Sequence, residues 1–171
     1  MSTRRRFAPY VAIAVALVLA MFVFLLATSE DEQSTRSPLL DKAAPAIAGT
    51  GFRDDAFDLD AERGKWVVVN FFSTTCVPCI QEHPELVKFS QEHGNDASVV
   101  SVTFEDKPAA VRDFFENNGG DWPVLLENTG SIAVAYGVVA VPESYLIDPF
   151  GIVRAKFLGG VRSDELSELI S

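Results

Sequence analysis

Residues 65–83 read KWVVVNFFSTTCVPCIQEH, and this stretch decides the fold. Its first eight residues form a short β-branched and aromatic run, which is typical of a strand buried on both faces. From Val77 to His93 the apolar residues recur at helical spacing. Cys76 and Cys79, the only two cysteines, therefore lie where a strand gives way to a helix. Such a pair is a redox couple or half of a metal site, and the strand-to-helix setting favours redox.

The chain from residue 46 onward alternates strands with helices. We expect a hairpin or meander over 46–64, strands over 98–104 and 123–126, helices over 108–118 and 129–136, an antiparallel hairpin of strands 144–148 and 152–158, and a last helix over 163–170 with Ser163 as its N-cap. This order predicts an α/β sandwich in which helices flank a central mixed sheet.

The N-terminal part of the sequence predicts export. Residues 7–27 are an almost unbroken apolar run without charge, and three arginines precede it. About 20 such residues suffice to cross a bilayer, and the positive-inside rule keeps residues 1–6 cytoplasmic. We therefore expect a transmembrane anchor over 7–27, a polar tether over 28–45 and an extracytoplasmic domain over 46–171. A cleaved signal peptide is the alternative, and it exports the same domain. The net charge of −10 argues against nucleic-acid binding.

The position of each cysteine predicts its chemistry. Cys76 at the N-terminal edge of the helix faces unpaired backbone N–H groups and a partial positive charge, which favour a thiolate. Cys79, one turn further in and facing the core, stays a thiol until it is needed. Pro78 costs little in the first helical turn. Cys76 is then the attacking sulfur, and Cys79 resolves the mixed disulfide.

Two stretches carry a family resemblance, VVVNFFSTTCVPCIQEHPEL at 67–86 and YGVVAVPESYLIDPFGIVRAKFLG at 136–159. The domain resembles a thioredoxin-fold protein of the exported TlpA/ResA/CcmG (DsbE) group of thiol-disulfide oxidoreductases. The resemblance implies a redox disulfide between Cys76 and Cys79, reduction of apocytochrome c in cytochrome c biogenesis, and recycling by a membrane dithiol donor. General reduction of exported proteins is the alternative. Neither a cofactor nor a resident metal is implied.

The resemblance also implies substrate-binding residues in the second stretch. Val141-Pro142 should be a cis peptide bond in a loop that faces the cysteines, where substrates dock by short backbone pairing. Glu143 resembles the residue that helps shape the substrate groove in cytochrome-maturation members, and an exposed loop glutamate is the alternative. Thr75 stands in place of the tryptophan that the family usually carries before the first cysteine, which leaves the client open.

Two positions separate this chain from thioredoxin itself. Asn70 replaces the buried acid that thioredoxins carry six residues before the first cysteine. Glu82 matches a glutamate that the exported group uses near its active site. One turn from Cys79, it could accept the proton that this thiol releases when it attacks. A negative charge there would disfavour the Cys76 thiolate, so we expect a reductant rather than an oxidant.

Three other interpretations of the cysteine pair remain. Cys76, Cys79 and His83 have C-x2-C-x3-H spacing, which is compatible with copper delivery on a thioredoxin scaffold. A peroxidase usually keeps its resolving cysteine far from the first. A purely structural disulfide would close too small a loop to stabilise the fold much.

Overall fold

The computed structural model describes residues 8–27, 37–104 and 106–171. The chain divides into two units, Met1–Gln33 and Ser34–Ser171, and the first contains helix α1 (Ala8–Ala27). Within the described ranges, no helix is long and apolar enough to cross a membrane. The anchor predicted over 7–27 is therefore not confirmed. Residues 28–36 of the predicted tether lie outside the described residues.

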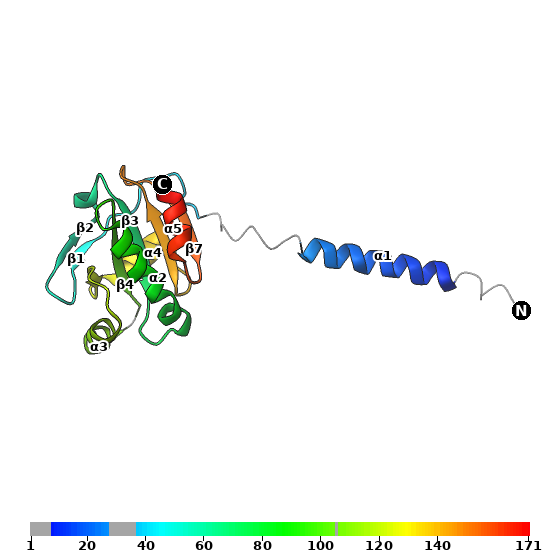
Figure 1. The fold of residues 1–171 in the computed structure, drawn as a ribbon, viewed down its shortest axis with the longest axis horizontal. Helices are drawn as coiled ribbons and strands as arrows, with labels where there is room; N and C mark the ends of the chain where they lie inside the picture. Colours follow the sequence, from blue (N-terminus) through cyan, green and yellow to red (C-terminus); the bar gives the residue numbers. More distant parts are fainter. Residues whose placement is uncertain (1–7, 28–36, 105) are drawn as a thin grey trace, which may run out of the picture. The chain divides into compact units, whose positions relative to one another are not determined.

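The second unit is built on a five-stranded mixed sheet in the order β5-β4-β3-β6-β7 (Figure 1). Its strands are β3 (Trp66–Phe72), β4 (Ala97–Thr103), β5 (Val124–Leu125), β6 (Glu143–Ile147) and β7 (Val153–Leu158). Strands β3, β4 and β5 are parallel to one another, whereas β6 runs antiparallel to β3 and β7 antiparallel to β6. The predicted mixed sheet and the predicted closing hairpin are both confirmed.

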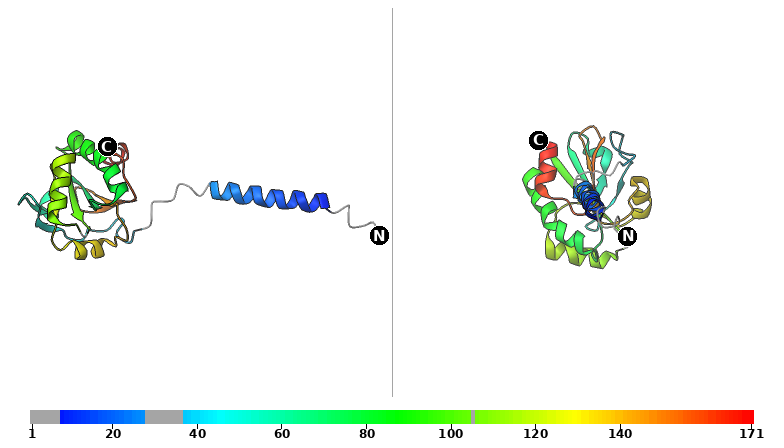
Figure 2. Two further views of the ribbon diagram at one scale, coloured as in Figure 1. Left: turned by 90° about the horizontal axis from the view of Figure 1, so that it is seen from below. Right: turned by 90° about the vertical axis from the view of Figure 1, so that its right-hand side faces the viewer.

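Helices cover both faces of this sheet, as predicted. They are α2 (Val77–His93), α3 (Pro108–Asn118), α4 (Thr129–Tyr136) and α5 (Ser163–Ile170), and a small hairpin of β1 (Ala48–Thr50) and β2 (Ala56–Asp58) precedes a 3-10 turn, η1 (Leu59–Glu62). Figure 2 shows α4 on the opposite side of the sheet from α2 and α5. One detail was wrong: the N-cap of α5 is Arg162, whose N–H donates to Glu165, and Ser163 is the first helical residue.

Strand β3 separates two hydrophobic cores because successive side chains point to opposite faces. Val67, Val69 and Phe71 pack into the core beneath α4. Val68 and Phe72 pack into the core that α2, α3 and α5 cover. Asn70 is buried and lies on the same face of β3 as Val68 and Phe72, so its amide faces α2. The fold thus places one polar side chain of its central strand under the helix that carries the cysteines.

The predicted tether is too long at its C-terminal end. The backbone N–H groups of Asp41 and Ala44 donate to the carbonyls of Val153 and Gly151, and Ala43 forms a bridge with Ile152. The neighbouring leucines and Ala44 pack against the α4-side core. These contacts make residues 37–45 part of the domain. Their polar, proline-containing sequence does not indicate this pairing, because the partners are backbone groups more than 100 residues away.

Candidate active site

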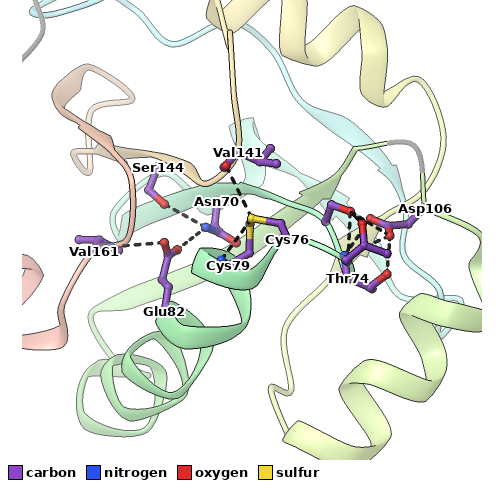
Figure 3. The surroundings of a disulfide bond; sticks show 11 residues. Asn70, Thr74, Cys76, Cys79, Glu82, Asp106, Val141, Ser144 and Val161 are labelled. Carbon is purple, nitrogen blue, oxygen red and sulfur yellow. Dashed lines mark hydrogen bonds between the residues drawn. A yellow bond between two sulfur atoms is a disulfide. The ribbon is translucent and has the colours of Figure 1, made fainter.

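Cys76 and Cys79 are joined by a disulfide at the N-terminus of α2 (Figure 3). Cys76 is the N-cap residue, and the helix begins at Val77. The backbone N–H of Cys79 donates to Sγ of Cys76 at 3.2 Å, a contact that would stabilise a thiolate there in the reduced protein. Cys76 is half-buried, whereas Cys79 is only 4% exposed. This placement supports Cys76 as the attacking sulfur and Cys79 as the resolving one.

The loop before β6 lies directly against the attacking sulfur. The peptide bond between Val141 and Pro142 is cis, as expected from the resemblance. The carbonyl oxygen of Val141 lies 3.6 Å from Sγ of Cys76 (Figure 3). The structure therefore brings a backbone carbonyl of this loop next to the sulfur of Cys76.

Glu82 is buried beneath the cysteine pair rather than exposed on the helix surface, with 4% of its area accessible. Asn70 Nδ2 donates to Glu82 Oε1 at 2.6 Å and to Ser144 Oγ at 3.0 Å, and the N–H of Val161 donates to Glu82 Oε2 at 3.3 Å (Figure 3). Ser144 is the register partner of Asn70 on β6. Asn70 thus stands where thioredoxin has its buried acid, and its amide binds a buried acid that α2 supplies.

Burial decides the charge of this acid. Desolvation raises the pKa of Glu82 to about 8, although the hydrogen bonds from Val161 and Asn70 lower it. At neutral pH the carboxyl is mostly protonated. The predicted repulsion between Glu82 and a Cys76 thiolate therefore acts only above about pH 8, and it does not explain a low redox potential at neutral pH. A carboxyl with this pKa is instead suited to exchange a proton with a thiol.

Glu143 is buried, so the alternative of an exposed loop glutamate is wrong. Its side chain is 1% exposed. Oε1 accepts the N–H groups of Val139 at 3.0 Å and Ala140 at 3.2 Å, and Oε2 lies 2.8 Å from Nζ of Lys156, itself 9% exposed. The alternation of β6 turns this side chain inward. Glu143 thus holds the segment that leads to Pro142.

Thr75 lies on the outer side of the site. It is exposed, and its Oγ1 lies 3.1 Å from Ser73 Oγ. Together with Cys76, Val141 and Lys107 it lines a pocket of about 470 Å³. The structure thus brings Thr75, the attacking sulfur and the cis-proline loop together around one hollow. Glu82 and Glu143 are not among the residues that line it.

Three polar residues that were not predicted from the sequence support this site. Ser144 orients the amide of Asn70, Lys156 pairs with Glu143, and Asp106 binds the turn before Cys76. The signal for Ser144 was a small polar residue followed by the apolar run of β6, much as Asn70 lies within the apolar run of β3. Lys156 and Asp106 gave no such signal, because their partners are distant in sequence.

The alternative metal site finds no support among residues 37–104 and 106–171. No group of three or more His, Cys, Asp or Glu side chains there is arranged to hold a metal ion. His83 is buried, and its Nε2 lies 2.9 Å from the carbonyl oxygen of Gly119. Its ring packs edge-on against Phe114 and Phe115. Desolvation in this aromatic setting lowers the pKa of His83.

Comparison with known proteins identifies the family. The Redoxin family model matches residues 40–170. The chain belongs to the Redoxin family. This redoxin is 28% identical over 160 residues to the thiol:disulfide interchange protein HelX of Rhodobacter capsulatus, covering 90% of this chain and 89% of HelX. It is 30% identical over 134 residues to the thiol-disulfide oxidoreductase ResA of Bacillus thuringiensis subsp. konkukian, covering 77% and 76%.

A solved structure gives the same result for the fold. A putative thiol:disulfide interchange protein DsbE from Chlorobium tepidum superposes with a TM-score of 0.66 at 26% identity, covering 76% of this chain and 94% of that one. With these relatives and its paired cysteines, this redoxin is a thiol-disulfide oxidoreductase of the DsbE/ResA/HelX type. Its site holds a half-buried sulfur at a helix N-terminus, a buried second sulfur and a buried acid on the same helix.

Proposed function

We propose that this redoxin reduces a disulfide in an exported client protein, and that the client is apocytochrome c before haem attachment. The observation that carries the proposal is the division of the site: Cys76 is open beside the Val141 carbonyl, while Cys79 is buried on the same helix as the buried Glu82. The resemblance to cytochrome-maturation members supports the choice of client.

The exchange would proceed in two displacements. The Cys76 thiolate attacks one sulfur of the client disulfide, forms a mixed disulfide and releases the first client thiolate. Cys79 then loses its proton to Glu82 in the minor fraction of molecules in which this carboxyl is ionised at neutral pH. It attacks Sγ of Cys76, which releases the second client thiolate. The client gains two electrons, and the protein is left with the Cys76–Cys79 disulfide. A membrane dithiol donor would return it to the reduced form.

The same proposal places the domain outside the cytoplasm. The uncharged run over residues 7–27, preceded by the three arginines, supports a single-pass anchor that leaves the domain on the extracytoplasmic face. A dithiol pair that works in an oxidising compartment needs a nearby electron source, which fits a membrane-bound donor. Extraction of the full chain from membranes at alkaline pH tests the anchor: a retained anchor stays in the pellet, and a cleaved signal does not.

Trapping the client in cells tests the function. A Cys79→Ala variant can form the mixed disulfide and cannot resolve it, so the client should accumulate on Cys76. A variant lacking both cysteines is the matched control. The proposal expects apocytochrome c, linked through one cysteine of its haem-attachment segment, as the main adduct of the single variant. A broad set of unrelated exported proteins would instead indicate general reduction, and no adduct at all would contradict the exchange mechanism.

A further inference from the structure

We propose that Asp106 is a positioning residue that holds the turn carrying Cys76 in place for the exchange reaction. The backbone N–H of Thr74 donates to both carboxylate oxygens of Asp106, at 3.1 Å to Oδ1 and 3.2 Å to Oδ2. The hydroxyl groups of Thr74 and Ser73 donate to Oδ1 as well, the latter at 3.2 Å (Figure 3). One carboxylate thus collects the donors of two successive residues.

This turn needs an external support. Between the end of β3 at Phe72 and the start of α2 at Val77, the chain is in neither sheet nor helix. The N–H of Cys76 donates to the carbonyl of Ser73 at 3.1 Å, so the position of Cys76 depends on Ser73. Ser73 Oγ also contacts Thr75 Oγ1 at 3.1 Å. Fixing Ser73 and Thr74 therefore fixes the backbone of the attacking cysteine.

Asp106 lies close in the chain to packed parts of the domain. It lies between β4 and α3, in the connection that leaves the sheet next to β3. The N–H of Phe104 donates to the carbonyl of Phe72 at 2.9 Å, which ties the two strand ends together. Val111 and Phe115 of α3 are fully buried in the core beneath α2. The carboxylate of Asp106 therefore links the turn that leads to Cys76 to the packed helix α3.

The position of Cys76 matters most in the second displacement. There Cys79 must attack a sulfur that is already bonded to the client, and the step is intramolecular. Its rate depends on how well the two sulfurs are held in line, and a misplacement of ~1 Å can cost ~100-fold. The first displacement, by a diffusing disulfide, needs only an accessible thiolate. Loss of Asp106 should therefore slow the second step far more than the first.

Reaction of the reduced protein with 5,5′-dithiobis(2-nitrobenzoic acid) separates these steps. Cys76 attacks the reagent and releases one thionitrobenzoate, and Cys79 then displaces the second while the Cys76–Cys79 disulfide forms. Stopped-flow absorbance gives the bimolecular first rate and the concentration-independent second rate. For Asp106→Ala we expect the second rate to fall about tenfold, an intermediate part of the range that misplacement produces, and the first to change less than about threefold.

Two further substitutions make the result specific. Asp106→Asn keeps an acceptor for the Thr74 N–H and removes the charge, so it should restore the second rate to within about threefold of the unmodified protein. Asp113→Ala removes a like charge from an exposed position on α3 and should leave both rates unchanged. Should Asp106→Ala fail to fold, Thr74→Val removes one donor alone and should slow the second step by about threefold.

A second rate in Asp106→Ala equal to that of Asp113→Ala would overturn the proposal. So would an Asp106→Asn variant that is as slow as Asp106→Ala, since charge rather than positioning would then be responsible. An equal fall of both rates would assign Asp106 a merely structural role. Thermal unfolding of the disulfide form of each variant accompanies the kinetics, so that a folding defect is distinguished from a defect in the second step.

Discussion

Replacing Glu82 by glutamine tests the buried acid, because glutamine has nearly the same size and cannot ionise. The pKa of Glu82 is about 8 in the folded protein and 4.5 ordinarily. The folded state therefore binds this proton more tightly than the unfolded chain does. The resulting stability is complete below about pH 4.5 and is lost as the pH rises toward 8. At about 1.4 kcal/mol per pH unit, the gap between the two pKa values corresponds to about 5 kcal/mol at most.

Local rearrangement around the new carboxylate and entry of water reduce this ceiling, and we expect a loss of about 2–3 kcal/mol. Urea unfolding of the disulfide form between pH 5 and 9 measures it, since no free thiol titrates there. The quantity to follow is the unfolding free energy of Glu82→Gln minus that of the unmodified protein. The lowered pKa of His83 has the opposite effect on stability, but it is present in both proteins and cancels.

The difference should rise by about 2–3 kcal/mol from pH 5 to 9. The matched control is Glu116→Gln, which removes an exposed carboxyl from α3 and should give a difference that does not depend on pH. A flat difference for Glu82→Gln, or one that falls with pH, would refute the reasoning that burial keeps this acid protonated. The variant should also slow the second displacement, because the proton acceptor of Cys79 is lost.

Two further predictions concern the loop and the redox poise. Lys156→Met leaves the buried carboxylate of Glu143 without its cation, and it should cost about 3 kcal/mol of stability in urea unfolding. The double variant that also carries Glu143→Gln should recover most of this loss. Equal stability of the single and double variants would contradict the prediction. Equilibration with glutathione buffers should give a potential more negative than about −180 mV, the value for protein disulfide isomerase, and a value near −120 mV, typical of a strong oxidant, would exclude a reductant.

Most of the secondary structure could be predicted from the sequence because prolines and glycines mark the ends of its elements. Pro108 opens α3 and two glycines close it, and the structure has the predicted bounds of this helix. The β-branched run before the cysteines could only be a buried strand, and β3 is buried along almost its whole length. The tether was wrong for residues 37–45, because backbone pairing with a distant hairpin leaves no pattern in a short polar segment.

The site was predictable where the chemistry depends on neighbours in the chain. Cys76 and Cys79 are placed by the start of α2 alone. The environment of Glu82 depends on Asn70, Ser144 and Val161, which come together only when β3, β6 and the segment before α5 are assembled. No local pattern states that this glutamate faces inward. The protonation of Glu82 at neutral pH follows from that assembly. Because the carboxyl is then uncharged, it does not repel a Cys76 thiolate as the sequence predicted.

The order in which the two thiols react shows which sulfur makes the first attack. The reduced protein is treated briefly with a limiting amount of iodoacetamide at pH 7, and the modified cysteine is identified by mass spectrometry. Cys76, half-buried with a backbone N–H directed at its sulfur, should be alkylated first, while Cys79, only 4% exposed, should remain a thiol. Alkylation of Cys79 first, or of both at equal rates, would contradict the assignment of Cys76 as the attacking sulfur.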